Sequence, residues 1–583
     1  MEENEITALK RQINELSAEL NSQKKYGLVW DKEKVPERVV QECEKKIPVL
    51  APSSHDFALN AGITDNLLIE GDNYHSLVAL NYILRNTIDA IYIDPPYNTG
   101  ERDFIYNDNY VDKEDGYRHS KWLTFMQRRL CLARTLLKDD GVLFVSIGDD
   151  EVNNIGLLLA SIFGEQNFIG LLPRIGKKSG KTTTTIAKNH DYVYIYTKNK
   201  DLVTFAEQAN DRDEKNLLKD EFYEERGAYR LNQCLDYDSL TYGKSMDYPL
   251  TINGETFYPG GSKKDWERRQ AGEHGKFDWT WRWSPAKVDF GLKNGFIVIK
   301  NGKRKRIYTK TYTKVSIVER NGSYTLEKFD DTKAFNSLVF TDNKYSNDNA
   351  KKEFASFGID EKFDFPKPSS LIKTCLQMIP KKDMVVLDFF AGSGTTGQAT
   401  LELNKEDGGN RRFILCTNNE NGICENITYQ RIKTVITGKK VDGTKFKDPA
   451  PGNLYFFKTA FVDDSDNTDQ AKYNLVSQLD PLLCIQESVF LPINRTNYSS
   501  HYSTENGKRH LFIYNDYFND ERMKRFKEDV AKAQGEKIVY IYSEDNEVDE
   551  SLFEDIPECD VRPIPEKIYE IYKQIVAGIK RGE

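Results

Sequence analysis

The order of the predicted elements is the feature that most constrains this chain of 583 residues. From Asn66 to about Lys200, apolar runs that suit strands alternate with segments of helical periodicity, as in "NLLIEGDN", "YHSLVALNYIL" and "IDAIYIDPP". The alternation stops near Asp201 and returns near Glu361 with "KPSSLIKTCLQMI", "MVVLDFF", "TTGQATLELN" and "RRFILCTNNE". Such alternation is typical of a doubly wound, mainly parallel sheet. The sequence therefore predicts an α/β fold that is interrupted by a long insertion.

The same rhythm divides the chain into predicted segments. An N-terminal helix over 1–24 repeats Ile and Leu at intervals of three and four, which is a short coiled-coil seam that could pair in a dimer or pack on its own chain. We expect the first part of the α/β domain at 25–200, an inserted domain at 201–360, the second part at 361–440 and a small α+β C-terminal domain at 441–583.

The stretch "IYIDPPYNTG" ends one predicted strand with Asp94, Pro95, Pro96 and Tyr97. One interpretation is a buried strand followed by a proline-rich turn, with Asp94 as a turn former. The other is a rigid active-site wall, because the prolines fix the backbone next to a carboxylate. The stretch alone does not decide between them.

A glycine-rich loop follows another predicted strand in "VVLDFFAGSGTTGQAT", and its glycines match the dinucleotide fingerprint G-x-G-x-x-G. In a nicotinamide site the turn glycines follow the strand directly, but here Asp388 and three further residues intervene. A carboxylate there would repel a pyrophosphate and could hold a cationic amine, which favours S-adenosylmethionine (SAM) over NAD. Glu420 follows the next strand, where an acid can hold ribose hydroxyls. A strand–helix turn without a ligand is the remaining alternative.

With "DPPY" at 94–97 and "DFFAGSGTT" at 388–396 on α/β strands, the chain resembles amino-group DNA methyltransferases. The order of the motifs is that of the permuted β-class. "DPPYNTGERDFIYNDNYVD", "HDYVYIYTKNK", "WRWS" and "FPKPSSLI" look like Mod subunits of type III restriction-modification systems, and the similarity covers about residues 25–435.

The resemblance implies a SAM-dependent, Rossmann-like methyltransferase with a target recognition domain in the insertion. It implies these cofactor contacts: Asp388, Phe389, Ala391, Gly392, Gly394 and Thr395 at the methionine end, Glu420 at the ribose, Asp72 near the adenine ring, and Phe365, Lys367 and Pro368 closing the pocket. "CTNNE" is more polar than usual for the family, so the choice between Glu420 and Asn418 stays open.

For the catalytic residues, the resemblance implies that Asp94 and a main-chain carbonyl at Pro95 accept hydrogen bonds from an exocyclic amine, and that Tyr97 stacks on a flipped base. Phe104 and Tyr106 could line the same cavity or simply pack the loop. The acidic first residue of the motif favours adenine N6, with cytosine N4 as the alternative.

Double-stranded DNA is the expected substrate, and the insertion has the composition to read it. We expect DNA contacts from basic and aromatic residues, namely Lys177, Lys178, Lys181, Trp281, Arg282, Lys303, Arg304 and Arg306. A small core around the tryptophans and solvated basic loops are the alternatives. A catalytically silent DNA-binding specificity subunit and an oxidoreductase are the other classes that the sequence leaves open.

Charge and composition bound the remaining expectations. No run approaches the roughly 20 apolar residues of a membrane span, and the charged N-terminus lacks a signal-peptide core, which predicts a cytoplasmic protein with no membrane partner. The eight cysteines show no metal-ligand spacing, so no metal site is expected. The sequence lacks a helicase P-loop, so DNA cleavage would need a partner chain, such as a Res subunit, beside a homodimer of this chain.

Overall fold

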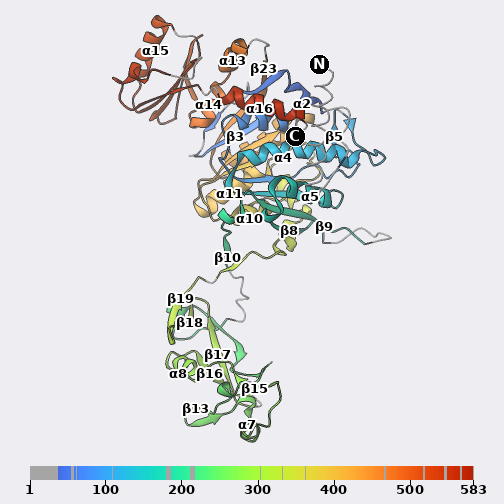
Figure 1. Ribbon diagram of the computed structural model, residues 1–583, viewed down its shortest axis with the longest axis vertical. Coiled ribbons are helices and arrows are strands. Elements are labelled where there is room, and N and C mark those ends of the chain that lie inside the picture. The colour runs from blue at the N-terminus through green and yellow to red at the C-terminus, as the bar shows by residue number, and fades with distance from the viewer. Residues whose placement is uncertain are drawn as a thin grey trace, which may run out of the picture. The chain divides into compact units, whose positions relative to one another are not determined.

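The computed structural model describes residues 30, 37–53, 58–60, 62, 64–107, 109–178, 186–209, 217–239, 241–302, 304–330, 332–361, 363–464, 468–516, 519–543, 548–564 and 567–581. The chain forms two compact units (Figure 1). The first comprises Met1–Ala206 together with Asn336–Glu583, and the second is Glu207–Phe335. The predicted N-terminal helix lies outside the described residues.

A ten-stranded sheet is the centre of the first unit. Its strands are β1 (Lys46–Pro52), β2 (Ala58–Asn60), β3 (Asp65–Glu70), β4 (Ile88–Ile93), β7 (Leu137–Ile147), β8 (Phe168–Ile175), β9 (His190–Thr197), β21 (Val385–Asp388), β22 (Arg412–Thr417) and β23 (Asn453–Asp463). They follow the order β1-β23-β3-β22-β21-β4-β7-β9-β8, and β2 pairs with β23. The run from β23 to β7 is parallel, whereas β1, β9 and β8 are antiparallel to their neighbours. The predicted α/β fold with a mainly parallel sheet is confirmed.

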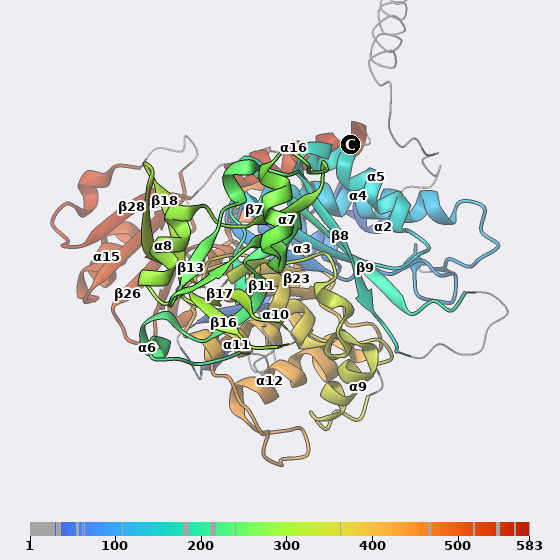
Figure 2. The ribbon, with the colours of Figure 1, turned by 90° about the horizontal axis from the view of Figure 1, so that it is seen from below.

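Helices cover both faces of this sheet (Figure 2). On one side lie α3 (Asn73–Asn81), α4 (Arg118–Leu136), α5 (Val152–Phe163) and the C-terminal α16 (Lys567–Arg581); on the other lie α9 (Asn347–Ala355), α10 (Ser369–Gln377), α11 (Thr395–Asp407) and α12 (Tyr429–Thr437). The short α2 (Arg38–Glu42) packs beside α3. Because helices cover both faces, every residue of β4 is buried, as expected of a central parallel strand.

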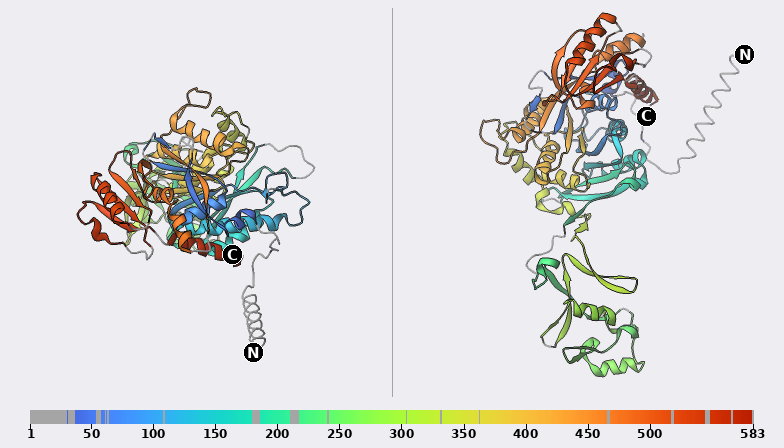
Figure 3. Two further views of the ribbon diagram at one scale, coloured as in Figure 1. Left: turned by 90° about the horizontal axis from the view of Figure 1, so that it is seen from above. Right: turned by 90° about the vertical axis from the view of Figure 1, so that its left-hand side faces the viewer.

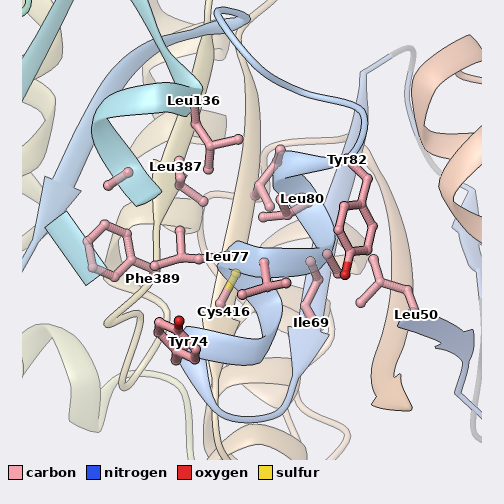
Figure 4. Close-up of a cluster of buried hydrophobic side chains, with 14 of the residues drawn as sticks. Leu50, Ile69, Tyr74, Leu77, Leu80, Tyr82, Leu136, Leu387, Phe389 and Cys416 are labelled. Carbon is pink, nitrogen blue, oxygen red and sulfur yellow. The ribbon is translucent and has the colours of Figure 1, made fainter. Parts of the chain in front are cut away.

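The core under α3 joins segments that are far apart in the sequence. Leu77 and Leu80 of α3 lie beside Ile69, Leu387 and Cys416, which come from β3, β21 and β22 (Figure 4). All five side chains are buried. Apolar packing of this kind holds the strands before and after the insertion in one sheet.

The C-terminal region does not separate from the first unit at the predicted boundary of 441. β23 joins the large sheet as an inner strand between β1 and β3, and its first five residues are buried there. A second sheet of β24 (Leu491–Arg495), β25 (Ser499–Ser503), β26 (Arg509–Tyr514), β27 (Glu536–Ile541) and β28 (Cys559–Pro563) follows, with α13 (Thr468–Val476), α14 (Asp480–Glu487) and α15 (Asp520–Lys532). Figure 3 shows this sheet in red and orange beside the blue β1 end of the large sheet.

The second unit is narrower than the predicted 201–360, since the contacts place 336–360 in the first unit. It contains β10 (Glu207–Ala209), β11 (Tyr229–Cys234), β12 (Asp236–Ser239), β13 (Leu250–Ile252), β14 (Glu255–Phe257), β15 (Asp278–Trp281), β16 (Ile297–Lys300), β17 (Arg306–Tyr312), β18 (Val315–Arg320), β19 (Ser323–Lys328) and β20 (Thr332–Ala334), with α6 (Tyr223–Arg226), α7 (Lys263–Gln270) and α8 (Pro285–Lys293). These strands form small antiparallel sheets.

One expected DNA contact in this unit is corrected. Trp281 is only 2% exposed and packs in the core with Leu235, Val288 and Ile307. Its indole N–H donates to the carbonyl of Tyr248 at 2.7 Å. Trp281 is therefore a core residue, because its large apolar ring is needed to build a core in so small a unit.

Among the described residues no helix is both long and apolar enough to cross a bilayer, and no group of acidic, histidine or cysteine side chains could hold a metal ion.

Candidate active site

The two sequence motifs meet at the carboxyl edge of the large sheet. β4 ends at Ile93, directly before Asp94, and β21 ends at Asp388, directly before the glycine-rich loop. β4 and β21 are parallel neighbours, with Leu387 opposite Ile91. Ligands of open α/β sheets bind at this edge, where the ends of parallel strands and the following loops converge.

A pocket of about 660 Å³ opens at this edge. Of the predicted site residues, it is lined by Asp72, Asp94, Pro96, Phe389, Gly392 and Glu420, together with Phe104. Asn418 lines it as well, so both residues between which the sequence could not choose are present.

The lining of the pocket is acidic and aromatic. Its carboxylates are Glu37, Glu42, Asp72, Asp94, Asp103 and Glu420, and among the described residues that line it Arg38 is the one basic side chain. Its rings are Phe104, Phe125, Phe363, Phe389 and Phe390. Such a pocket disfavours a pyrophosphate and suits a ligand with positive charge and a flat ring.

Asp94 is the acid at the junction of the two motifs. Both of its carboxylate oxygens accept hydrogen bonds from the ammonium of Lys367, at 2.7 and 2.6 Å. The Pro96 carbonyl accepts from the indole N–H of Trp122 at 2.7 Å, which anchors the second proline of the motif to α4. The motif is therefore a fixed wall and not a free turn.

Tyr97 is half-buried, and its hydroxyl donates to Asp191 at 3.2 Å. Asp191 is in turn paired with the buried guanidinium of Arg174, whose Nε lies 2.6 Å from Asp191 Oδ1. Burial, with the charges of Asp191 and Asp94, raises the pKa of Tyr97 well above its usual range, so the hydroxyl stays a neutral donor. A Cβ at Gly148 would lie 2.7 Å from the Tyr97 ring, so the ring needs a glycine beside it.

The chain is also held on the far side of Tyr97. The Asn98 side chain is buried, and its backbone adopts the left-handed conformation, with φ of +56°. Asparagine tolerates this conformation better than most residues. Its amide donates to the buried carboxylate of Glu151 at 2.5 Å, and His119 Nδ1 lies 2.6 Å from the same carboxylate. Burial raises the pKa of Glu151. These contacts fix the exit of the motif, with Asn98 and Glu151 buried and His119 exposed.

The glycine-rich loop is clamped by residues that sequence reasoning missed. Arg431 of α12 is fully buried and donates to the hydroxyls of Ser393 at 2.9 Å and Thr395 at 2.8 Å. Burial lowers the pKa of Arg431 to about 10. Thr428 donates to the Gly392 carbonyl at 2.5 Å from a π-helical turn, Ile423–Thr428. π-helical turns are frequent at functional sites. No pattern in the sequence indicated this turn.

Four predicted cofactor residues, Ala391, Gly394, Thr395 and Pro368, are absent from the pocket lining, and the first three support the glycine-rich loop from within it. Thr395 is buried, and its hydroxyl accepts a hydrogen bond from Arg431. The main-chain N–H of Gly394 donates to the carbonyl of Ala391 at 2.8 Å. Gly392 and Gly394 have φ of +49° and +80°, which only glycine adopts easily. Pro368 is the residue directly before α10 and makes no side-chain hydrogen bond to the helix.

Asp388 is buried behind the loop. Its carboxylate accepts from the Thr396 hydroxyl at 2.5 Å and from the Phe390 N–H at 3.0 Å. Burial raises its pKa to about 7, although those two hydrogen bonds act in the opposite direction. Asp388 is therefore an acid whose ionisation is costly in this structure.

Asp72 lines the pocket and caps α3, where it accepts from the Tyr74 N–H at 2.7 Å. It also faces Arg129, a fully buried guanidinium that sequence reasoning missed. Arg129 pairs with Glu37 at 2.7 Å and stacks on Phe125 at 3.6 Å. All three partners line the pocket, so Arg129 organises one wall of it. The pair of arginines in "FMQRRL", on an otherwise apolar helical face, was the available signal.

Phe365 does not close the pocket as expected. It is 73% exposed, and Phe363 lines the pocket instead. The alternation in "FDFPKP" carried a signal for both rings, but only packing decides which one turns inward. A Cβ at Gly392 would lie 3.3 Å from the Phe363 ring, so the glycine lets this ring approach the loop.

Of the expected DNA contacts, Lys177 and Lys178 are exposed at the end of β8, and Lys181 and Lys303 lie outside the described residues. Arg282 is exposed and stacks on Tyr237 at 4.1 Å. Arg306 pairs with Asp236 at 2.9 Å, and Arg304 lies 3.6 Å from the same acid.

Known proteins that are similar to this chain in sequence include Mod subunits of restriction-modification enzymes and a type II methyltransferase. The Mod subunit of the type III restriction-modification enzyme EcoPI, from Escherichia phage P1, is 31% identical over 68% of this chain and 64% of its own length. The StyLTI Mod subunit, from Salmonella typhimurium, is 29% identical over 77% of this chain and 70% of its own length. The type II methyltransferase M.KpnI, from Klebsiella pneumoniae, is 32% identical over 63% of this chain and 84% of its own length.

This chain therefore spans about two thirds of the length of the two Mod subunits. A family model described as DNA methylase matches residues 88–430, which is more than half of the chain and includes both strand-end motifs. From that match and the similarity to M.KpnI, the chain belongs to the DNA methylase family.

Proposed function

We propose that this protein transfers a methyl group from SAM to the N6 amine of adenine within a specific sequence of double-stranded DNA. The observation that carries the proposal is the position of Asp94 on the wall of an acidic pocket, beside the glycine-rich loop. The match to the DNA methylase family supports the same reaction class.

The pocket suits SAM in the charge and in the aromatic character of its lining. The acids Glu37, Glu42, Asp72, Asp103 and Glu420 suit a ligand that carries an ammonium and a sulfonium, and the phenylalanine rings suit an adenine. Glu420 would take the ribose, Asp72 would lie near the adenine, and Gly392 would let the main chain approach the ligand. SAM supplies an electrophilic methyl group when it is bound.

Asp94 would compensate for the low nucleophilicity of the exocyclic amine. The lone pair of an exocyclic amine is delocalised into its ring, so the amine must be aligned and drawn toward a tetrahedral form. The Asp94 carboxylate accepts one N–H, and because Trp122 occupies the Pro96 carbonyl, the mechanism assigns the other N–H to the Pro95 carbonyl. Fixed acceptors turn a bimolecular encounter into a held one. The proton leaves during or after transfer, when the nitrogen is cationic.

Tyr97 supplies the face on which a flipped base stacks. Extruding a base costs a few kcal/mol, and an aromatic face recovers about 1–3 kcal/mol. The Tyr97 hydroxyl is tied to Asp191, so the ring is fixed before the base arrives. An acidic first residue in the motif favours adenine N6; cytosine N4 is the second candidate on the same geometry.

The unit Glu207–Phe335 would read the DNA sequence. It carries 24 lysine and arginine residues against 21 aspartate and glutamate residues, whereas the whole chain has a net charge of −9. Arg282, Arg304 and Arg306 remain the proposed contacts within it, and Lys177 and Lys178 of the first unit are proposed to contact phosphates.

Replacing Glu207–Phe335 by the corresponding unit of a relative is expected to change the methylated sequence, because base readout would lie in this unit while the chemistry lies in the other. The modified base should stay the same, since Asp94 and Tyr97 are untouched. Long-read sequencing of DNA from cells that express the chimaera measures both. An unchanged methylated sequence in an active chimaera contradicts the assignment.

We further propose that the protein acts as the modification and specificity subunit of a type III-like system, as a homodimer and with a restriction (Res) subunit for cleavage. The similarity to the EcoPI and StyLTI Mod subunits supports this role. A cytoplasmic location follows from the proposed DNA substrate.

The test of the function is direct. Purified protein with SAM that carries a labelled methyl group is incubated with unmethylated genomic DNA, and the product is hydrolysed and identified by mass spectrometry. N6-methyladenine is the expected product; N4-methylcytosine supports the second candidate. Binding of the DNA without transfer of label contradicts the enzyme and favours a silent specificity subunit.

A further inference from the structure

The carboxylate of Asp94 has a buried cationic partner whose role the sequence did not reveal. The Nζ of Lys367 lies 2.7 Å from Asp94 Oδ1 and 2.6 Å from Oδ2, and the Lys367 side chain is only 8% exposed. The family resemblance implied that Lys367 closes the cofactor pocket, yet Lys367 is absent from the residues that line it. Its ammonium is directed to the acid.

We propose that Lys367 is a positioning residue of methyl transfer, which holds the Asp94 carboxylate in the orientation that accepts the target amine. This inference rests on the proposed function. A carboxylate offers about four acceptor positions. The ammonium takes one on each oxygen, so each oxygen keeps a position for an N–H of the amine, and the plane of the carboxylate is set.

Lys367 is itself anchored to the glycine-rich loop. Pro366 and Pro368 restrict the backbone on either side of it. The Thr395 hydroxyl donates to the Lys367 carbonyl at 3.2 Å, and Arg431 donates to that same hydroxyl at 2.8 Å. The loop that would contact the methyl donor and the acid that would orient the acceptor are therefore joined through one residue.

The same ammonium reaches the other end of the motif. Lys367 Nζ lies 5.0 Å from the centroid of the Tyr97 ring, within the range of a cation–π contact. The Tyr97 hydroxyl is fixed separately by Asp191. One cation thus contacts both the acid that would orient the amine and the ring that would stack on the base.

Lys367 also neutralises the charge of Asp94. A partly buried carboxylate without a partner is costly, and it would attract another cation or turn away from the site. Lys367 supplies the counter-charge from a direction that leaves Asp94 on the pocket wall. A guanidinium could keep the charge, but its planar fork would meet the carboxylate differently from a compact ammonium.

The test compares Lys367→Ala and Lys367→Arg with the matched control Lys381→Ala. Lys381 Nζ lies 3.0 Å from the buried Asp89 and 2.7 Å from Asp140, so the control removes an ion pair from the same unit but away from the site. We expect the single-turnover rate of methyl transfer, with SAM and DNA saturating, to fall about 100-fold in Lys367→Ala. The Kd values for SAM and for DNA should change by less than about threefold. Lys367→Arg and added ethylammonium should each recover part of the rate, and Lys381→Ala should keep it.

Two results overturn the inference. If Lys367→Ala weakens SAM binding while its rate at saturating SAM is normal, Lys367 is a wall of the cofactor pocket. If neither arginine nor ethylammonium recovers any activity, and the thermal stability falls further than in Lys381→Ala, its role is structural only. Asp94→Ala separates this inference from the function: an inactive Asp94→Ala with a fully active Lys367→Ala refutes the role of Lys367 alone, whereas an active Asp94→Ala refutes the proposed chemistry.

Discussion

Asp94→Ala is expected to lower the single-turnover rate of methyl transfer by about 1,000-fold, because it removes the charged acceptor that aligns the amine. It also leaves the ammonium of Lys367 without its acid. SAM binding should persist, since Asp72, Glu420 and the glycine-rich loop are unchanged. The measurement is a rapid-quench assay with labelled SAM, beside a calorimetric titration of SAM.

Asp112→Ala is a suitable control, because Asp112 is an exposed acid of the same segment of the chain. It should methylate DNA at the wild-type rate. Asp94→Asn should fall between wild type and alanine, since an amide keeps one acceptor oxygen but loses the charge. A wild-type rate in Asp94→Ala would refute the mechanism.

Asp388→Asn is expected to stabilise the ligand-free protein above pH 7 by up to about 4 kcal/mol. Burial raises the pKa of Asp388 from 3.8 to about 7 in the folded state. The folded state therefore binds a proton more tightly than the unfolded state, and its stability falls as the pH rises from about 4 to about 7. Each unit of the difference corresponds to about 1.4 kcal/mol, and the asparagine variant lacks this loss.

The raised pKa of Asp388 fixes the direction in which the stability difference should change with pH. The difference in unfolding free energy between Asp388→Asn and wild type, measured with denaturant, should be small near pH 4, rise up to pH 7 and then stay constant. Asp89→Asn is a control in which the change in unfolding free energy should have the opposite sign. Burial acts to raise the pKa of Asp89, but the Val385 N–H and the ammonium groups of Lys138 and Lys381 lower it overall, so this variant should be destabilised. A difference for Asp388→Asn that does not change with pH would contradict the prediction.

Keeping a costly buried acid beside the loop is consistent with a cationic ligand. A nearby ammonium or sulfonium favours the ionised carboxylate and offsets the cost of burial. SAM should therefore raise the melting temperature of wild type more than that of Asp388→Asn at pH 8.

Much of the fold followed from patterns that act over short distances. The apolar runs of 88–93 and 385–388 are strands because their side chains suit a sheet that is buried on both faces. Gly164 ends α5 at φ +92°, as its place after the apolar run indicates. The boundaries at 360 and 441 shifted, because strand β23 and helix α9 fit the first unit through contacts with distant segments.

The sequence by itself determined that an acid–proline motif and a glycine-rich loop each follow the end of a strand, and that both strands belong to one sheet. The chemistry of those residue types restricts their ligands even before their neighbours are known. The tertiary structure decided which side chains meet. Lys367 reaches Asp94 across 273 residues, Arg129 holds the acids of one wall, Phe363 turns inward where Phe365 does not, and Trp281 is buried in a core. Periodicity can tell which face of an element a side chain occupies, but its partner comes from another segment, and only packing brings that segment to it.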